Sequence, residues 1–389
     1  MRAAGALALA VAVAGCGGDD GGGGGGGVDL TRPPVVDVTV EPPTHLSDYN
    51  LFAWDPATAT YTFNPTGDRV VAYDMNSPLF SDYALKQRAL YVPPGASATY
   101  DPELEFELPV GSLILKNFAF PADLRAPTQD VTLIETRVLV RYPDGWHPLP
   151  YVWDAAQQDA VLTPAGEGRV ISFIDDQGAA RTANYLVPQR NQCQTCHSRI
   201  ATTGDAPAIV PIGLKARHLN RSYDYGGAVG AANQLTRMTT AGVLTGAPDP
   251  ATIPAAYDFR PIAAGGVAAI PAADVDAAAR AYLDINCAHC HDPHGVQGVT
   301  SQLFLGHDNT DLFHLGYCKR PGSAGAGTGG FEFDIVPGSP DTSILYFRIH
   351  TEQVGAMMPL LGRSLEHTRG SELIHAWIAA MPAMDCNAM

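Results

Sequence analysis

The chain has 389 residues, which is enough for two or three domains with a sizeable core. Its formal net charge is −16 and only 16% of its residues are charged, so it offers no basic patch of the kind that neutralises nucleic-acid phosphates. Its apolar content, 46%, is ordinary for a globular protein and argues against wholesale disorder.

The first residues resemble the export signal of a bacterial lipoprotein. Residues 1–15 contain Arg2 and an apolar run that is too short to span a bilayer. The small residues before Cys16 resemble a lipobox, in which the cysteine is lipidated; the alternative is an ordinary signal peptide with a coincidental cysteine. Residues 16–27 add a glycine run that behaves as a flexible tether with a reach of about 18 Å. We therefore expect a lipid-anchored protein on the periplasmic side of a bacterial membrane, inner or outer.

Residues 28–188 have the pattern of an antiparallel β domain. Short runs of β-branched or alternating apolar residues are separated by Pro and Gly, which predicts strands in a sandwich or barrel-like arrangement. The strongest run, residues 131–141, pairs with residues 151–153 across the turn at 143–145. We find no cluster of ligating residues in this segment. The expected strands are 35–40, 59–63, 68–73, 103–108, 111–118, 131–141, 151–153, 170–174 and 183–187.

A Cys-x-x-Cys-His motif, Cys193-Gln-Thr-Cys196-His197, follows the last expected strand. This spacing is the pattern of covalent haem attachment, in which two thiols add to the porphyrin vinyl groups and the histidine binds the iron. We assign residues 189–270 to a first haem segment, with short helices at 213–220 and 231–238.

The second iron ligand of this first haem stays open. Met238 and His218 both lie downstream of the motif and within loop reach. If neither of them binds, the iron is five-coordinate and open to a small ligand.

A second motif, Cys287-Ala-His-Cys290-His291, follows a predicted amphipathic helix at 273–286. Another amphipathic helix is expected at 371–381. This order of helix, haem motif, irregular middle and final helix resembles class I cytochromes c, so residues 271–389 are expected to form such a domain. Proteins of that class have a second axial ligand before the last helix, and Met358, which precedes a proline, is preferred over Met357.

The cysteine count supports this interpretation. A zinc site or a redox dithiol also uses Cys-x-x-Cys pairs, but neither needs a histidine directly after each pair. Of the seven cysteines, one is assigned to lipid and four to haem. The two that remain, Cys318 and Cys386, are predicted to form a disulfide, because disulfides persist in exported proteins.

Several stretches together resemble a family of bacterial lipoprotein dihaem c-type cytochromes of unassigned physiological role. The resemblance implies haem attachment at Cys193, Cys196, Cys287 and Cys290, with His197 and His291 as iron ligands. It implies no particular reaction. The stretches are 77–84, 109–116, 191–197, 211–217, 279–291, 333–338 and 358–363.

These observations define the expected protein. The fold class is multi-domain α+β, with an N-terminal antiparallel β domain followed by a mainly α-helical dihaem region. The cofactors are two covalently bound haem c groups. The expected function is one-electron transfer between redox partner proteins, such as an exported dehydrogenase, other cytochromes or a membrane electron donor. The alternative is a dihaem oxidoreductase of the peroxidase type, with one open-coordinate haem; a module whose β domain docks a partner is a weaker third.

Overall fold

The computed structural model describes residues 28–200, 206–296, 299 and 301–388. The predicted signal peptide, lipidated Cys16 and glycine tether lie outside the described residues. Within the described part of the chain, no helix is both long enough and apolar enough to cross a membrane.

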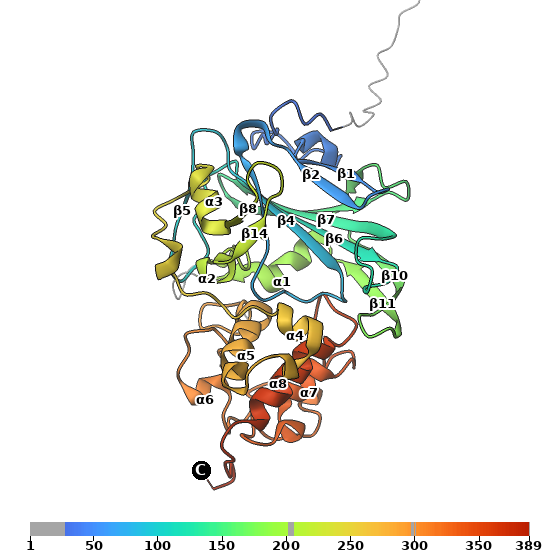
Figure 1. Ribbon diagram of the computed structural model, residues 1–389. Helices are drawn as coiled ribbons and strands as arrows, with labels where there is room; N and C mark the ends of the chain where they lie inside the picture. Colours follow the sequence, from blue (N-terminus) through green and yellow to red (C-terminus); the bar gives the residue numbers. More distant parts are fainter. Residues whose placement is uncertain (1–27, 201–205, 297–298, 300, 389) are drawn as a thin grey trace, which may run out of the picture.

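An antiparallel sheet of six strands is the largest element, in the order β3-β4-β6-β7-β8-β9 (Figure 1). Its strands are joined mostly by short connections, and β7 and β8 form a hairpin across Pro143 and Asp144, at the predicted turn. The β-branched and aromatic residues of these runs suit a pleated, half-buried surface. The strand bounds are β3 Val70–Tyr73, β4 Leu85–Tyr91, β6 Leu113–Pro121, β7 Val131–Tyr142, β8 Gly145–Trp153 and β9 Ala160–Leu162.

The two faces of this sheet have different coverings. One face packs under the hairpin of β1 (Phe52–Asp55) and β2 (Thr60–Phe63), in a core that includes Leu113, Leu115 and Tyr151. The other face has an apolar cluster around Ile114 and Leu214 towards one edge, and a second cluster around Phe118 and Tyr185 towards the other. The row of side chains between these two clusters is largely polar.

The hairpin β10 (Glu167–Ile174) and β11 (Ala180–Val187) confirms the hairpin predicted from residues 170–174 and 183–187. Its Phe173 and Tyr185 pack in the apolar cluster around Phe118, on the face of the sheet that the β1–β2 hairpin does not cover. The remaining strands are short: β5 Ala98–Thr99, β12 Ser198–Arg199, β13 Ala208–Ile209, β14 Ser222–Asp224, β15 Ala231–Asn233 and β16 Leu244–Thr245.

The C-terminal third is built around the pair of helices α5 (Val275–Leu283) and α8 (Thr368–Ala379), which gather below the sheet in Figure 1. Apolar residues at helical spacing face each other between them, as predicted, and the indole N–H of Trp377 donates to Asp276 at 2.7 Å. The other helices are α1 Gln194–His197, α2 Ala216–Leu219, α3 Gln234–Thr240, α4 Arg260–Gly265, α6 Leu312–Leu315 and α7 Ile344–His350.

The predicted fold class is wrong. Strand content (26%) exceeds helix content (24%), and the region after residue 188 is not mainly helical. The helices among the described residues are short, α8 being the longest at 12 residues. The chain contains 40 Gly and 31 Pro, and frequent helix breakers prevent long helices in its second half.

Some predicted elements are also absent or shorter than expected. Residues 35–40 and 103–108 form no strand, although Phe106 and Leu108 are buried. The predicted helix at 213–220 shrinks to α2, and the one at 231–238 becomes β15 and α3. The alternation at 103–108 therefore marks a packed loop, because its neighbours provide only isolated backbone bridges at Thr99 and Lys215.

The predicted disulfide between Cys318 and Cys386 is present, with the two Cα atoms 5.0 Å apart. It links the loop after α6 to the C-terminal tail across 68 residues of sequence. Both cysteines are buried beside Phe333, in a small apolar cluster of their own.

Candidate functional site

The first motif stands at the junction between the sheet and the rest of the chain. After β11 the chain turns through a 3-10 helix, Arg190–Cys193, whose start is closed by reciprocal hydrogen bonds between Gln189 and Gln192. Helix α1 follows at once and carries Cys196 and His197. This turn places both motif cysteines and the histidine on one short segment under the sheet.

The hydrogen bond of His197 fits an iron ligand. Its Nδ1 lies 2.7 Å from the carbonyl oxygen of Val210 and donates to it, so Nε2 is the bare nitrogen. Burial lowers the pKa of His197 to about 4, so the imidazole is neutral at pH 7. A neutral ring held in this tautomer is what binding to a metal requires.

Cys193, Cys196 and His197 line a cavity. The centres of water-sized spheres can occupy about 150 Å³ of it, and the whole space free of atoms, including the open mouth, is about 1380 Å³. The six-stranded sheet supplies part of the cavity wall. Most of the surface of the whole cavity is apolar. The C-terminal third also contributes to it, through Ile285 and Leu361. We call this the first cavity.

The second motif follows α5, which continues as one π-helical turn, Asp284–Ala288. Such turns are frequent at functional sites. Cys287, Cys290 and His291 line a second cavity of about 430 Å³, or about 1540 Å³ with its mouth. Its wall includes Leu303, Leu305, Ile344 and Ile349, so its character is mainly apolar.

Met358 and His291, which the sequence predicts as the two iron ligands of the second haem, both line the second cavity. Met357 is not among the residues that line it. Burial lowers the pKa of His291 to about 4, and its Nδ1 lies 3.3 Å from the Ser301 hydroxyl. The structure therefore brings together the residues that the sequence assigned to this haem.

The two residues suggested for the first haem lie elsewhere. Met238 is fully buried in the apolar cluster around Leu235 and does not line the first cavity. His218 is also fully buried, and its Nε2 is 2.6 Å from the Asp284 carboxylate. The methionine that does line the first cavity is Met75, which the sequence did not single out.

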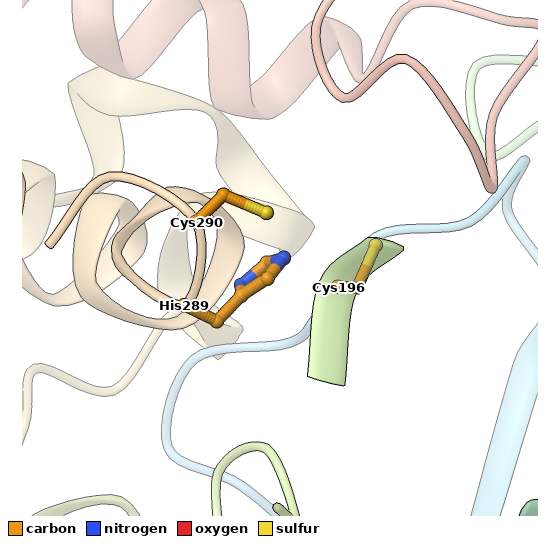
Figure 2. Close-up of side chains that lie close together, drawn as sticks. All are labelled: Cys196, His289 and Cys290. Atoms are coloured by element: carbon orange, nitrogen blue, oxygen red, sulfur yellow. The ribbon is translucent and has the colours of Figure 1, made fainter. Parts of the chain in front are cut away.

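The two cavities adjoin. The residues that line both are Cys196, Asn286, His289, Pro359 and Leu361. Figure 2 shows Cys196 of the first motif facing His289 and Cys290 of the second, and their ligating atoms all lie within 4.8 Å of one another. The Cys290 thiol also donates to the carbonyl oxygen of Thr195, at 3.5 Å.

A metal site formed by these three side chains is the strongest alternative to haem binding. Free thiols and an imidazole at this spacing suit zinc, but a structural zinc site uses four ligands. Among the described residues this cluster offers three. Neither His197 nor His291 belongs to this cluster, so a zinc ion there would not account for the two motif histidines.

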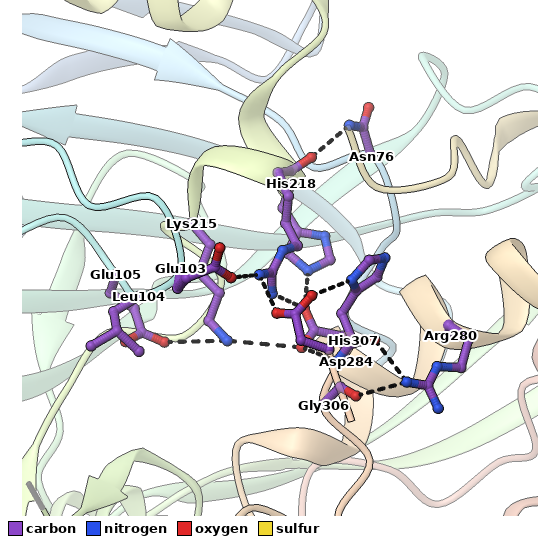
Figure 3. Close-up of polar contacts among 12 residues, drawn as sticks. Asn76, Glu103, Leu104, Glu105, Lys215, His218, Arg280, Asp284, Gly306 and His307 are labelled. Atoms are coloured by element: carbon purple, nitrogen blue, oxygen red, sulfur yellow. Dashed lines mark hydrogen bonds and ion pairs between the residues drawn. The ribbon is translucent and has the colours of Figure 1, made fainter. Parts of the chain in front are cut away.

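A buried ionic network holds the second motif in place (Figure 3). Asp284, one turn before Cys287, accepts from His218 and lies 3.8 Å from the Lys215 ammonium and 3.7 Å from the Arg217 guanidinium. Burial alone would raise the pKa of Asp284, but the His218 hydrogen bond and these cations hold it well below its usual value.

Further bonds connect the second motif to the β domain. The Asn286 amide oxygen accepts from the backbone N–H of Phe80 at 2.9 Å, and its amide nitrogen donates to the Pro78 carbonyl at 3.0 Å. Arg217 also bonds Glu103 and Asp308, on two different loops. The helix that carries Cys287 is thereby fixed relative to the sheet.

Three basic residues of the sheet were missed from the sequence. Arg88, Lys116 and Arg137 all line the first cavity. A signal was present, because Lys116 and Asn117 interrupt an apolar strand, and a buried lysine needs a partner. The expectation that the β domain contains no cluster of ligating residues does not hold for this row of basic side chains.

No protein-family model, curated protein or solved structure matches this chain in the comparisons.

Proposed function

We propose that this chain is an exported dihaem c-type cytochrome that passes single electrons between redox partner proteins. The observation that carries the proposal is the pair of adjoining cavities, each lined by one complete Cys-x-x-Cys-His motif. Electron transfer between two centres needs a short separation, and walls shared at Cys196 and His289 provide it.

The chain's own residues would do the following work. Cys193, Cys196, Cys287 and Cys290 would form the thioether bonds, and His197 and His291 would bind iron through Nε2. When bound, each haem supplies a one-electron couple. Met358 offers a soft, neutral thioether, which favours ferrous iron and raises the reduction potential. The apolar walls exclude water, which limits reorganisation on electron transfer.

A haem count and peptide masses test this proposal. We expect two pyridine haemochromes per chain, and haem mass on the peptides of both motifs. Cys193→Ala/Cys196→Ala and Cys287→Ala/Cys290→Ala should each leave one haem, whereas Cys318→Ser/Cys386→Ser, the matched control, should leave two. Zinc bound stoichiometrically to a chain with four free motif thiols would overturn the proposal.

A peroxidase-type oxidoreductase is the second candidate, and one observation favours it. The two residues that the sequence offered as second iron ligand, Met238 and His218, do not line the first cavity, so a haem iron there would be open to peroxide as long as Met75 does not bind it. If the first haem is high-spin and the protein turns over peroxide, this function holds. Two low-spin haems without peroxide turnover would support the electron-transfer protein.

The proposal includes a lipid anchor at Cys16 and a periplasmic location. It rests on the lipobox-like sequence and the glycine tether. Labelling with a radioactive fatty acid should mark the wild-type chain, and Cys16→Ser should abolish the label and release the protein from the membrane fraction. A labelled Cys16→Ser chain would contradict the anchor.

A further inference from the structure

We propose that Arg88, Lys116 and Arg137 form a carboxylate-binding row that receives the propionate groups of the haem in the first cavity. The inference rests on the proposed function. The three residues stand in one register row: Arg88 of β4 pairs with Lys116 of β6, which pairs with Arg137 of β7. Like charges directly opposite one another in a sheet are destabilising, so a bound anion would stabilise this row.

The charge around this row is unbalanced. Arg137 forms a bidentate pair with the buried Glu135, at 2.6 and 2.9 Å, and Arg88 bonds Asp74 at 2.9 Å. The Lys116 ammonium has no hydrogen bond or ion pair with any described residue, and it lies 5.0 Å from the ring centroid of Phe118. One positive charge is therefore left over in the middle of the row.

Burial and the neighbouring cations make this charge costly. Burial, followed by the charges of Arg88, Lys86 and Arg137, holds the pKa of Lys116 well below its usual value. A bound carboxylate would reverse this effect, because an opposite charge at close range favours the ammonium.

The first cavity has no acidic side chain among the described residues that line it. Its other walls are mostly apolar, contributed by residues such as Ile114, Leu139 and Leu149. An occupant that matches both features is flat and apolar with an acidic edge, which describes a porphyrin bearing two propionates. The second cavity differs, because it has one acid, Asp334, and one base, Arg348.

Three variants of the full-length chain test the row. Lys116→Met removes the unpaired charge and Lys116→Arg keeps it. Lys86→Met is the matched control: Lys86 lies 5.7 Å from the same Phe118 ring, but it donates to the Ala84 carbonyl and does not line the first cavity. The readouts are haem count, spin state and the midpoint potential of the first haem, assigned as the step that persists in Cys287→Ala/Cys290→Ala.

We expect two haems in each variant. A nearby cation disfavours ferric iron, so Lys116→Met should shift the reduction equilibrium of the first haem about tenfold towards ferric, a fall of about 59 mV for one electron. The potential of the first haem in Lys116→Arg should stay near the wild-type value. In Lys86→Met it should shift less than in Lys116→Met. If Lys116→Met fails to load the first haem while Lys116→Arg loads it, the charge requirement is upheld.

Other outcomes would contradict the proposed role of these three residues in carboxylate binding. An unchanged potential in Lys116→Met would show that no carboxylate depends on this lysine. A change of the first haem to high spin in both Lys116 variants would make the lysine an iron ligand. Failure of both variants to load the haem would indicate a packing role. A wild-type chain without haem would overturn the proposed function itself, which the haem count reports separately.

Discussion

The side chains that would face the proposed haem irons differ between the two cavities. Beside its histidine, the second cavity has Met358 and, among the described residues that line it, a single arginine, Arg348, whereas the first has Met75 and the row of three cations. A thioether ligand and a nearby positive charge both stabilise ferrous iron. Two different devices would therefore raise the potentials of the two haems.

Replacing Met358 by alanine should lower the potential of the second haem. Loss of the thioether leaves ferric iron relatively better stabilised, and we expect a shift of tenfold or more in the reduction equilibrium, at least about 59 mV. Spectroelectrochemical titration measures it. Met357→Ala is the control, because Met357 does not line the cavity. An equal shift in both variants would show that Met358 is not the ligand.

Asp284→Asn should destabilise the fold by about 3 kcal/mol, because it leaves buried cations without their partner. The folded pKa of Asp284 lies below the unfolded value near 3.9, so its contribution is complete above about pH 4 and is lost as the pH falls through the folded pKa. Denaturant titrations from pH 3 to pH 7 should show the difference from wild type narrowing only at the acid end.

The exposed Asp341 provides a control for that experiment, since its side chain is 82% exposed. Asp341→Asn should change the stability little at any of these pH values. A pH-independent penalty for Asp284→Asn would mean that its charge does not stabilise the fold.

Among the elements, the helix pair α5 and α8 and the disulfide stabilise two different parts of the C-terminal third. The helices bury Leu373, Ile374 and Ile378 around the start of the motif. The disulfide fixes the loop that follows α6, where helical packing is sparse. The C-terminal third is therefore stabilised by helix packing in one part and by a covalent crosslink in another.

Removing the crosslink should reduce stability substantially. Closing a loop of this length restricts the unfolded chain by about 4 kcal/mol in the chain-entropy model, so Cys318→Ser/Cys386→Ser should unfold at lower denaturant. Urea titration of both proteins with and without a thiol reductant checks this. The reductant should bring wild type down to the variant; a wild-type midpoint that ignores it would show that the crosslink contributes nothing.

On the scale of the whole molecule, the first cavity belongs to no single segment. Its wall combines the sheet, the loop around the first motif and residues of the C-terminal third, among them Asn286 and Leu361. The β domain is therefore part of the site. Division of the chain into independent haem domains at residue 270 would cut through one binding cavity.

A chain ending at residue 270 should show this dependence. We expect it to attach one haem at Cys193 and Cys196 but to leave that haem open to solvent. Added cyanide or carbon monoxide should bind it at least tenfold more tightly than the same haem in the full chain. Spectral titration measures the affinity, and adding residues 271–389 in trans serves as the control. Identical affinities would indicate that the first haem needs no C-terminal residues.

The sequence predicted what depends on spacing along the chain. The motifs, the apolar faces of α5 and α8, the β10–β11 hairpin and the disulfide partners follow from local patterns. It did not predict what depends on pairing between distant strands. The row of Arg88, Lys116 and Arg137 exists only through register, and residues 103–108 lack the neighbours that would make them a strand.

The contact between Cys196 and Cys290 has a consequence for how the protein matures. In a chain that has reached the proposed periplasmic location without haem, both side chains would be thiols, and their sulfurs lie within 4.8 Å of each other. An oxidising compartment would join them into a disulfide, which would block both attachment motifs at once. We predict that chain produced without haem acquires a Cys196–Cys290 crosslink detectable by peptide mapping, so that reduction must precede haem ligation in its assembly.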